Sequence, residues 1–152
     1  AASDVYKRQG GKRKGILVFA RFLKEAERLT MSIPGCVIVS GDTPKKERER
    51  ILEMFKVGEI PVVANVGVLT TGFDYPELDT VVMARPTMSL AMYYQIVGRC
   101  IRPHKDKEAA WFVDLCGNIN RFGEVSDLHL KDTGNGKWAV FSRGRQLTNV
   151  RF

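Results

Sequence analysis

The sequence predicts a parallel α/β domain, and three observations support this fold class. Five short runs are almost continuously apolar, which is typical of parallel strands covered on both faces. Helical patterns of ten or more residues separate most of these runs. The 152 residues are 44% hydrophobic and 27% charged, which are values of one globular domain with its own core. The predicted strands are Ile16–Ala20, Cys36–Val39, Pro61–Val66, Leu78–Met83 and Ala109–Leu115.

Three segments have the periodicity of helices. Residues 22–31 place apolar side chains on one stripe and charged side chains outside it. Residues 44–57 are predicted to begin with Thr43 as N-cap and Pro44 at the first helical position. Residues 89–101 form the third predicted helix, which we expect to end before Pro103 because proline disfavours helix at the preceding residue.

The two ends of the chain differ from its middle. The net charge is +7, but residues 15–116 carry thirteen basic and thirteen acidic side chains, so the excess lies in residues 1–14 and 117–152. Residues 1–14 are interpreted as a cloning remnant or flexible basic leader. Residues 15–116 are the predicted α/β lobe. Residues 117–152 are predicted to be an extension that packs on the lobe or reaches toward a missing partner, with one hairpin arm at 138–141.

Several classes of protein are disfavoured. No apolar run approaches the roughly 18 residues of a membrane span, and no signal peptide opens the chain. The cysteines, Cys36, Cys100 and Cys116, are far apart and are not accompanied by clustered histidines, which argues against a zinc site or a disulfide framework. We therefore expect reduced thiols, no metal ligands, no membrane partner and a cytoplasmic location.

Unusual residues follow the predicted strands. Arg21 follows the first strand, Gly41 the second, Thr70 to Asp74 come shortly after the third, and Arg85 follows the fourth. Ligands collect at the carboxyl ends of parallel strands, so the sequence predicts that these residues share one edge and form a site there.

The third predicted helix carries Arg99 and Arg102 three residues apart, with Gly98 inside the helix at a cost of about 1 kcal/mol relative to alanine. Two guanidinium groups on one face suit phosphate recognition, because each can bind oxyanions with two N–H groups. A solvated basic helix end that the helix dipole favours is the alternative.

These segments together resemble the second RecA-like lobe of superfamily two ATP-dependent helicases and translocases. Residues 16–20 resemble motif IV, residues 39–48 and 55–58 the segment that follows it, residues 68–76 motif V, and residues 95–102 motif VI with its Q/H-x-x-G-R-x-x-R pattern. The amino-acid sequences of motifs V and VI look most like those of bacterial and phage DEAD/DEAH-type DNA helicases.

The resemblance implies roles for individual residues. Arg99 and Arg102 would be arginine fingers for ATP hydrolysis, and Arg102 would be the first choice for the γ-phosphate. The residues implied at the ATP cleft and in coupling the two lobes are Gly72, Asp74, Gln95 and Gly98. The residues implied in binding nucleic acid are Arg21, Gly41, Arg48, Asn65 and Thr70. Val66 departs from the threonine of many relatives, and Cys100-Ile101 replaces the Thr-Gly common in RNA helicases.

The chain contains no G-x-x-x-x-G-K-[S/T] sequence and no Asp-Glu metal-binding motif. The resemblance therefore implies a partner, the N-terminal RecA-like lobe, and ATP with Mg²⁺ bound only in the two-lobed parent. We expect the isolated chain to bind ATP poorly and to hydrolyse none, and the parent to contact the DNA backbone. The alternatives are a translocase subunit of a restriction or repair complex, a non-enzymatic nucleic-acid-binding domain, and an ordinary α/β domain whose arginines form surface ion pairs.

Overall fold

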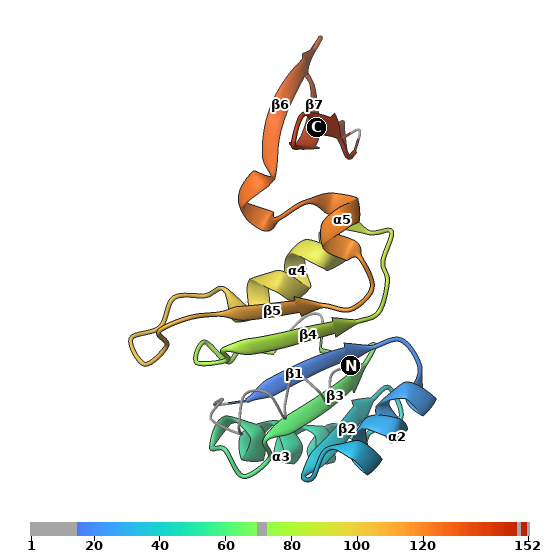
Figure 1. The fold of residues 1–152 in the computed structure, drawn as a ribbon, viewed down its shortest axis with the longest axis vertical. Coiled ribbons are helices and arrows are strands. Elements are labelled where there is room, and N and C mark those ends of the chain that lie inside the picture. Colours follow the sequence, from blue (N-terminus) through green and yellow to red (C-terminus); the bar gives the residue numbers. More distant parts are fainter. Residues whose placement is uncertain (1–14, 70–72, 149, 152) are drawn as a thin grey trace.

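A computed structural model describes residues 15–69, 73–148, 150 and 151 of the chain. Its main body is a parallel sheet with the strand order β2-β3-β1-β4-β5 (Figure 1). The strands are β1 Ile16–Ala20, β2 Cys36–Ser40, β3 Val62–Val66, β4 Thr80–Ala84 and β5 Trp111–Asp114. This is the RecA-like parallel α/β fold that the sequence predicts.

Helices follow the first, second and fourth strands. They are α2 Leu23–Ser32, α3 Lys45–Lys56 and α4 Leu90–Cys100. Side chains cap two of them: Glu25 Oε2 accepts hydrogen bonds from the backbone N–H of Arg21 and of Phe22, and Ser89 Oγ accepts one from Met92 N at 3.2 Å. The predicted cap of the other helix is wrong. Pro44 is the N-cap of α3, because the Thr43 hydroxyl turns back to accept from Ser40 N at 3.0 Å.

The sheet has a hydrophobic layer on each face. On one face, buried side chains of α3 and α4, such as Phe55 and Ile96, pack against Leu17, Val63 and Val81 of the strands. On the other face, α2 packs through Ala26 and Leu29 on a smaller layer of strand residues. Because both faces are covered, β1 is buried at all five positions, which explains its continuously apolar sequence.

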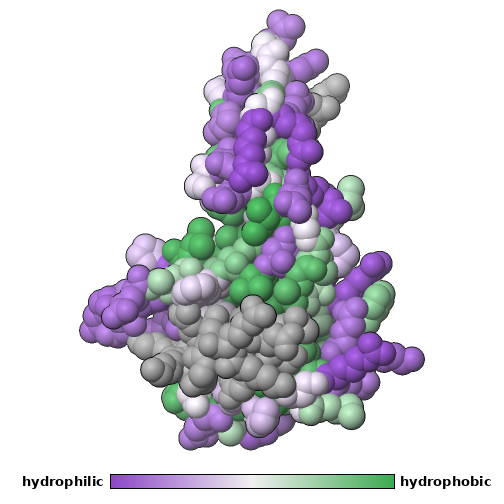
Figure 2. All heavy atoms as spheres, viewed as in Figure 1, coloured by the Kyte–Doolittle hydropathy of each residue, from purple (hydrophilic) through white to green (hydrophobic). Residues whose placement is uncertain are grey.

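The extension contains more regular structure than the single hairpin arm predicted for it. It begins with the short helix α5 Asn118–Phe122 and the 3₁₀ turn η1 Val125–Asp127. In the described part of the chain it continues as an antiparallel sheet of β6 His129–Gly134, β7 Lys137–Ser142, β8 Arg145–Gln146 and β9 Val150–Arg151. The β6–β7 hairpin projects from the body (Figure 1). Its outer part is hydrophilic, and apolar residues gather at its base (Figure 2).

None of the helices in the described ranges is long and apolar enough to span a membrane.

Candidate functional site

Helix α4 brings the two arginines of the predicted motif to the amino end of the sheet. The helix starts beyond the carboxyl end of β4 and runs back across the sheet face, so its last turn lies beside the segment that leads into β4 (Figure 1). Tyr93, Ile96, Val97 and Cys100 are its buried residues, spaced as one helical face. Arg99 and Arg102 are therefore presented from the end of a helix that its own core contacts hold in place.

The segment 73–75 supplies the partners of both arginines. The rings of Phe73 and Tyr75 are buried against Phe55 of α3, with ring centroids 6.3 and 5.4 Å from it. Asp74, between them, is left on the outside. Arg99 Nη1 donates to the backbone oxygen of Phe73 at 2.5 Å, and Arg102 Nη1 donates to the carboxylate of Asp74. The buried rings thus hold the segment in place, and its backbone oxygen and exposed carboxylate contact the arginines, so the ends of motifs V and VI meet here.

The two guanidinium groups lie in different electrostatic surroundings. Burial lowers the pKa of Arg99, the positive charge of Arg102 lowers it further, and Asp74 opposes both effects. The side chains of Arg102 and Asp74 are 46% and 75% exposed, so their ion pair is solvated. A solvated pair contributes about 0–1 kcal/mol to stability. Arg102 can therefore leave Asp74 for another anion at little energetic cost, whereas Arg99 is held to the backbone.

Two further predicted residues lie on α4. Gln95 is exposed, and Gly98 is partly exposed. Among the described residues, a Cβ built on Gly98 would meet no atom within 4 Å. Packing inside the described lobe therefore does not require glycine here. The missing side chain leaves room for a surface outside the lobe to approach the helix next to Arg99 and Arg102.

The predicted site residues do not share one edge of the sheet, which corrects the sequence-based expectation. Arg21 and Gly41 follow the carboxyl ends of β1 and β2, and Arg48 lies in the first turn of α3 at the same edge. Asp74 and the α4 arginines lie near the opposite, amino end of β4, because Asp74 precedes the first residue of β4 by six positions and α4 runs back across the sheet from the carboxyl end of β4. The two predicted groups are thus separated by the length of the strands.

The carboxyl edge carries solvent-exposed groups. Arg21 is exposed, with its guanidinium carbon 4.8 Å from the centroid of the Phe22 ring. Gly41 is exposed, and in the described chain a Cβ there would touch nothing within 4 Å. Arg48 is partly exposed. These positions are accessible to an extended anionic ligand. Thr70 and Gly72, predicted as nucleic-acid and ATP-cleft residues, lie outside the described residues.

Asn65 has a structural role that the sequence did not indicate. It is fully buried at the end of β3, and its carboxamide oxygen accepts hydrogen bonds from the backbone N–H of Val68 and Leu69 at 3.1 and 3.0 Å. A side chain with no exposed surface cannot touch nucleic acid in this conformation. In this structure Asn65 shapes the turn after β3 through these two hydrogen bonds.

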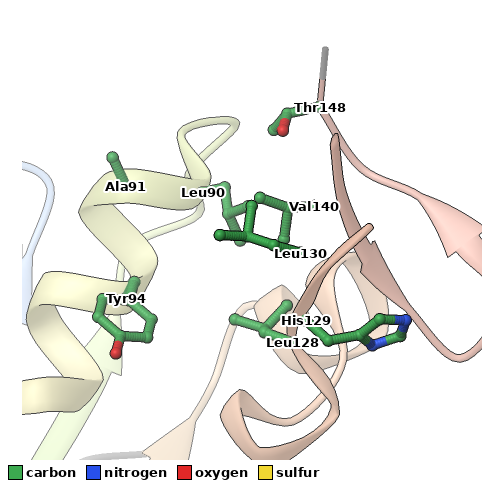
Figure 3. Close-up of a pocket in the computed structure, with 8 residues that line it drawn as sticks. All are labelled: Leu90, Ala91, Tyr94, Leu128, His129, Leu130, Val140 and Thr148. Carbon is green, nitrogen blue, oxygen red and sulfur yellow. The ribbon is translucent and has the colours of Figure 1, made fainter. Parts of the chain in front are cut away.

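A hollow lies between α4 and the extension. It has a volume of about 450 Å³ and is lined mainly by apolar side chains, among them Leu90, Tyr94, Leu130 and Val140. Figure 3 shows Leu90 of α4 facing Leu130 and Val140 of the hairpin, while the His129 ring points away from them. A lining of this kind offers no charged donors to a phosphate, so the hollow does not suit a nucleoside triphosphate.

Comparison with known proteins identifies the family. The family model described as the helicase conserved C-terminal domain matches residues 3–104, more than half of the chain. The chain belongs to this family. It is 34% identical over 109 residues to the ATP-dependent RNA helicase DBP3 of Gibberella zeae, a match covering 68% of this chain and 19% of that protein. It is 35% identical over 100 residues to the DNA 3'-5' translocase XPB2 of Sulfurisphaera tokodaii, covering 64% and 22%.

The solved structures agree on the lobe. The C-terminal domain of the DEAD-box protein Dbp5 superimposes with a TM-score of 0.58 at 25% identity, covering 78% of this chain and 72% of that one. The helicase C-terminal domain described here is thus a superfamily two motor lobe with the RecA-like fold. It spans between 12% and 23% of the length of the curated relatives that it matches.

Proposed function

We propose that this helicase C-terminal domain is the second motor lobe of an ATP-dependent DNA helicase, in which Arg99 and Arg102 act on the phosphates of ATP. The observation that carries the proposal is the position of the two guanidinium groups at the exposed end of α4, one anchored to the backbone and one in a solvated ion pair with Asp74. Such a pair is poised to exchange its carboxylate for phosphate oxygens.

The arginines would act only when an N-terminal lobe presents the nucleotide. The described residues contain no group of three His, Cys, Asp or Glu side chains that could hold a metal ion, and the resemblance implies that Mg²⁺ binds with ATP in the two-lobed parent. When bound to the partner lobe, ATP with Mg²⁺ supplies the phosphoryl group that is transferred. Arg102 would then release Asp74 and place its charge beside the γ-phosphate, while Gly98 allows the opposite surface to come close.

The carboxyl edge would hold the nucleic-acid strand. Arg21 and Arg48 would bind backbone phosphates, and the exposed backbone at Gly41 would allow close approach. Phosphate contacts carry no sequence information and release counterions, so we expect binding without sequence preference that weakens as salt rises. Because the two groups lie at opposite ends of the strands, ATP and nucleic acid would bind this lobe at separate places and be coupled through the body between them.

DNA is proposed over RNA for two reasons. Cys100-Ile101 stands where RNA helicases commonly have Thr-Gly, and one relative is named as a DNA translocase. Another relative is named as an RNA helicase, so RNA is the competing substrate. The translocase name also supports the second candidate, a motor that moves on duplex DNA without separating strands.

The test uses the two-lobed parent and this chain alone. We expect ATP hydrolysis by the parent that DNA stimulates more than RNA, and none by the isolated chain. Stimulation by RNA alone would contradict the DNA assignment. A strand-displacement assay beside a triplex-displacement assay separates the helicase from the translocase.

The nucleic-acid edge has a matched pair of arginines on α3. In the parent, Arg48→Ala should weaken DNA binding and lower the slope of log K against log salt by about one. Arg50→Ala is the control, because Arg50 is exposed on the same helix but is paired with Glu47 at 2.6 Å. Equal losses for both variants would remove Arg48 from the proposed interface.

A further inference from the structure

A lysine outside every motif joins the two segments that carry the arginine site. Lys107 lies in the loop between α4 and β5, and its ammonium group donates to three backbone oxygens: Pro76 at 3.0 Å, Leu78 at 3.1 Å and Cys100 at 2.8 Å. An ammonium group has three N–H donors. All three are therefore accounted for by backbone carbonyls.

These acceptors belong to the two arms of the site. Pro76 and Leu78 follow Asp74 by two and four residues, in the segment that supplies the partners of both arginines. Cys100 is the last residue of α4 and stands between Arg99 and Arg102. The carbonyls of a last helical turn lack partners within the helix, and a positive charge at that end is favoured by the helix dipole. Lys107 meets both requirements and ties α4 to the 73–79 segment.

A buried thiol and a buried carboxyl group belong to the residues beside these carbonyls. Cys100 is fully buried, and burial raises the pKa of its thiol to about 11, with Lys107 partly offsetting that rise. The thiol is therefore neutral at physiological pH. Asp79, buried at the start of β4, accepts a hydrogen bond from the Thr80 hydroxyl. Lys107 thus stabilises the junction through the dipoles of the three backbone carbonyls that it contacts.

We propose that Lys107 is a positioning residue, which sets the distance between α4 and the 73–79 segment and so aims Arg99 and Arg102. This rests on the proposed function of the arginine pair. Lys107 would touch neither ATP nor nucleic acid. Its loss would let the two arms separate, so that Arg102 and Asp74 no longer keep a common geometry when the partner lobe closes.

The first test measures local opening in this chain by hydrogen exchange. In Lys107→Met, amides of residues 73–79 and 97–102 should exchange roughly tenfold faster or more, as expected when a local hydrogen-bonded unit opens. Amides of β1 and β3 should keep their rates. Lys105→Met is the matched control, because it removes the same charge from an exposed position in the same loop. Unchanged exchange in Lys107→Met would overturn the proposal and would mean that the aromatic contacts of Phe73 and Tyr75 suffice.

The second test measures ATP hydrolysis in the two-lobed parent, with rates corrected for the fraction of active enzyme. Lys107→Met should lower kcat on the order of 10²-fold, the loss expected from a misplacement of about 1 Å. Lys107→Arg keeps the charge and N–H donors, so it should recover part of the lost kcat. If the Lys107 side chain only filled apolar space, Lys107→Arg would not recover the rate. A full rate in Lys107→Met, in a parent that Arg102→Ala inactivates, would overturn the proposal. A parent in which Arg102→Ala keeps full activity would instead refute the arginine function, and the exchange result would still decide the role of Lys107.

Discussion

The two ends of α4 are held in opposite ways. At its first turn the contacts are neutral: Tyr93 Oη donates to the backbone oxygen of Gly123 at 2.8 Å in a buried hydrogen bond, and the exposed Ser89 hydroxyl caps the helix. At its last turn the contacts involve charged side chains that are partly open to solvent, in the pairs of Arg99 with Phe73 and of Arg102 with Asp74.

The difference assigns separate tasks to one helix. Buried hydrogen bonds are expensive to break, so the first turn fixes α4 to the extension. Solvated ion pairs contribute little to stability, so Arg102 at the last turn is free to exchange Asp74 for another anion. We therefore expect substitutions at the first turn to change stability and substitutions at the last turn to change activity. The predictions below test this division.

The largest stability effect is expected at Asn118. Its side chain is fully buried in α5, accepts from Thr87 N at 2.9 Å, and donates to the backbone oxygen of Arg85 at 3.0 Å and to Asp114 at 2.9 Å. Asn118→Ala would leave these groups buried without partners and should lower the free energy of unfolding by about 2–4 kcal/mol. Urea denaturation measures this. A loss below about 1 kcal/mol would mean that the first turn of α4 is not held through α5.

A smaller effect is expected at Tyr93. Tyr93→Phe removes one buried hydroxyl and should cost about 1–2 kcal/mol, because the Gly123 oxygen loses its donor. Burial, with the charges of Asp114 and Glu124, raises the pKa of Tyr93 to about 12 from its ordinary value of 10.0. The neutral hydroxyl is thus favoured by folding, and its contribution is complete below pH 10 and lost as the pH rises toward 12. Between pH 10 and 12 the free energy of unfolding of the wild-type chain should fall relative to that of Tyr93→Phe. Urea denaturation at several pH values measures this, and parallel curves of unfolding free energy against pH would contradict it.

The smallest stability effect is expected at the last turn. Asp74→Asn removes the charge from an exposed pair and should change the free energy of unfolding by less than about 1 kcal/mol. The same denaturation experiment measures it. A change as large as that of Asn118→Ala would erase the contrast between the ends and show that the arginine pair is structural.

The sheet of the lobe could be predicted from sequence, whereas in the extension the sequence predicts only the hairpin arm at 138–141, which lies in β7. The inner strands β1 and β3 are buried at nearly every position, so they appear in the sequence as continuous apolar runs, which are typical of parallel strands. In the extension all six residues of β6 are exposed, so its sequence carries no hydrophobic signal. The hairpin is formed instead by the Asn135-Gly136 turn with positive φ at both positions and by pairing with β7.

The sequence predicts which residues form the candidate site, and this remains a prediction; their placement in the fold differs from the single edge that was expected. Spacing placed Arg99 and Arg102 on one helix face, but the direction of α4 decides which edge of the sheet they reach, and the helix returns to the amino end. Contacts made by backbone atoms leave no sequence pattern. The oxygen of Phe73 and the three carbonyls around Lys107 are of this kind, so neither role could be recognised in advance.

The central claim is that Arg102 serves the chemistry of ATP and not the fold. Its most direct test is the steady-state ATPase rate of the two-lobed parent carrying Arg102→Ala, beside Arg143→Ala as a control that removes an exposed, ion-paired arginine from the extension. The account predicts that Arg102→Ala lowers kcat about 10³-fold or more with unfolding unchanged, and that Arg143→Ala keeps the rate. A normal rate in Arg102→Ala would contradict it.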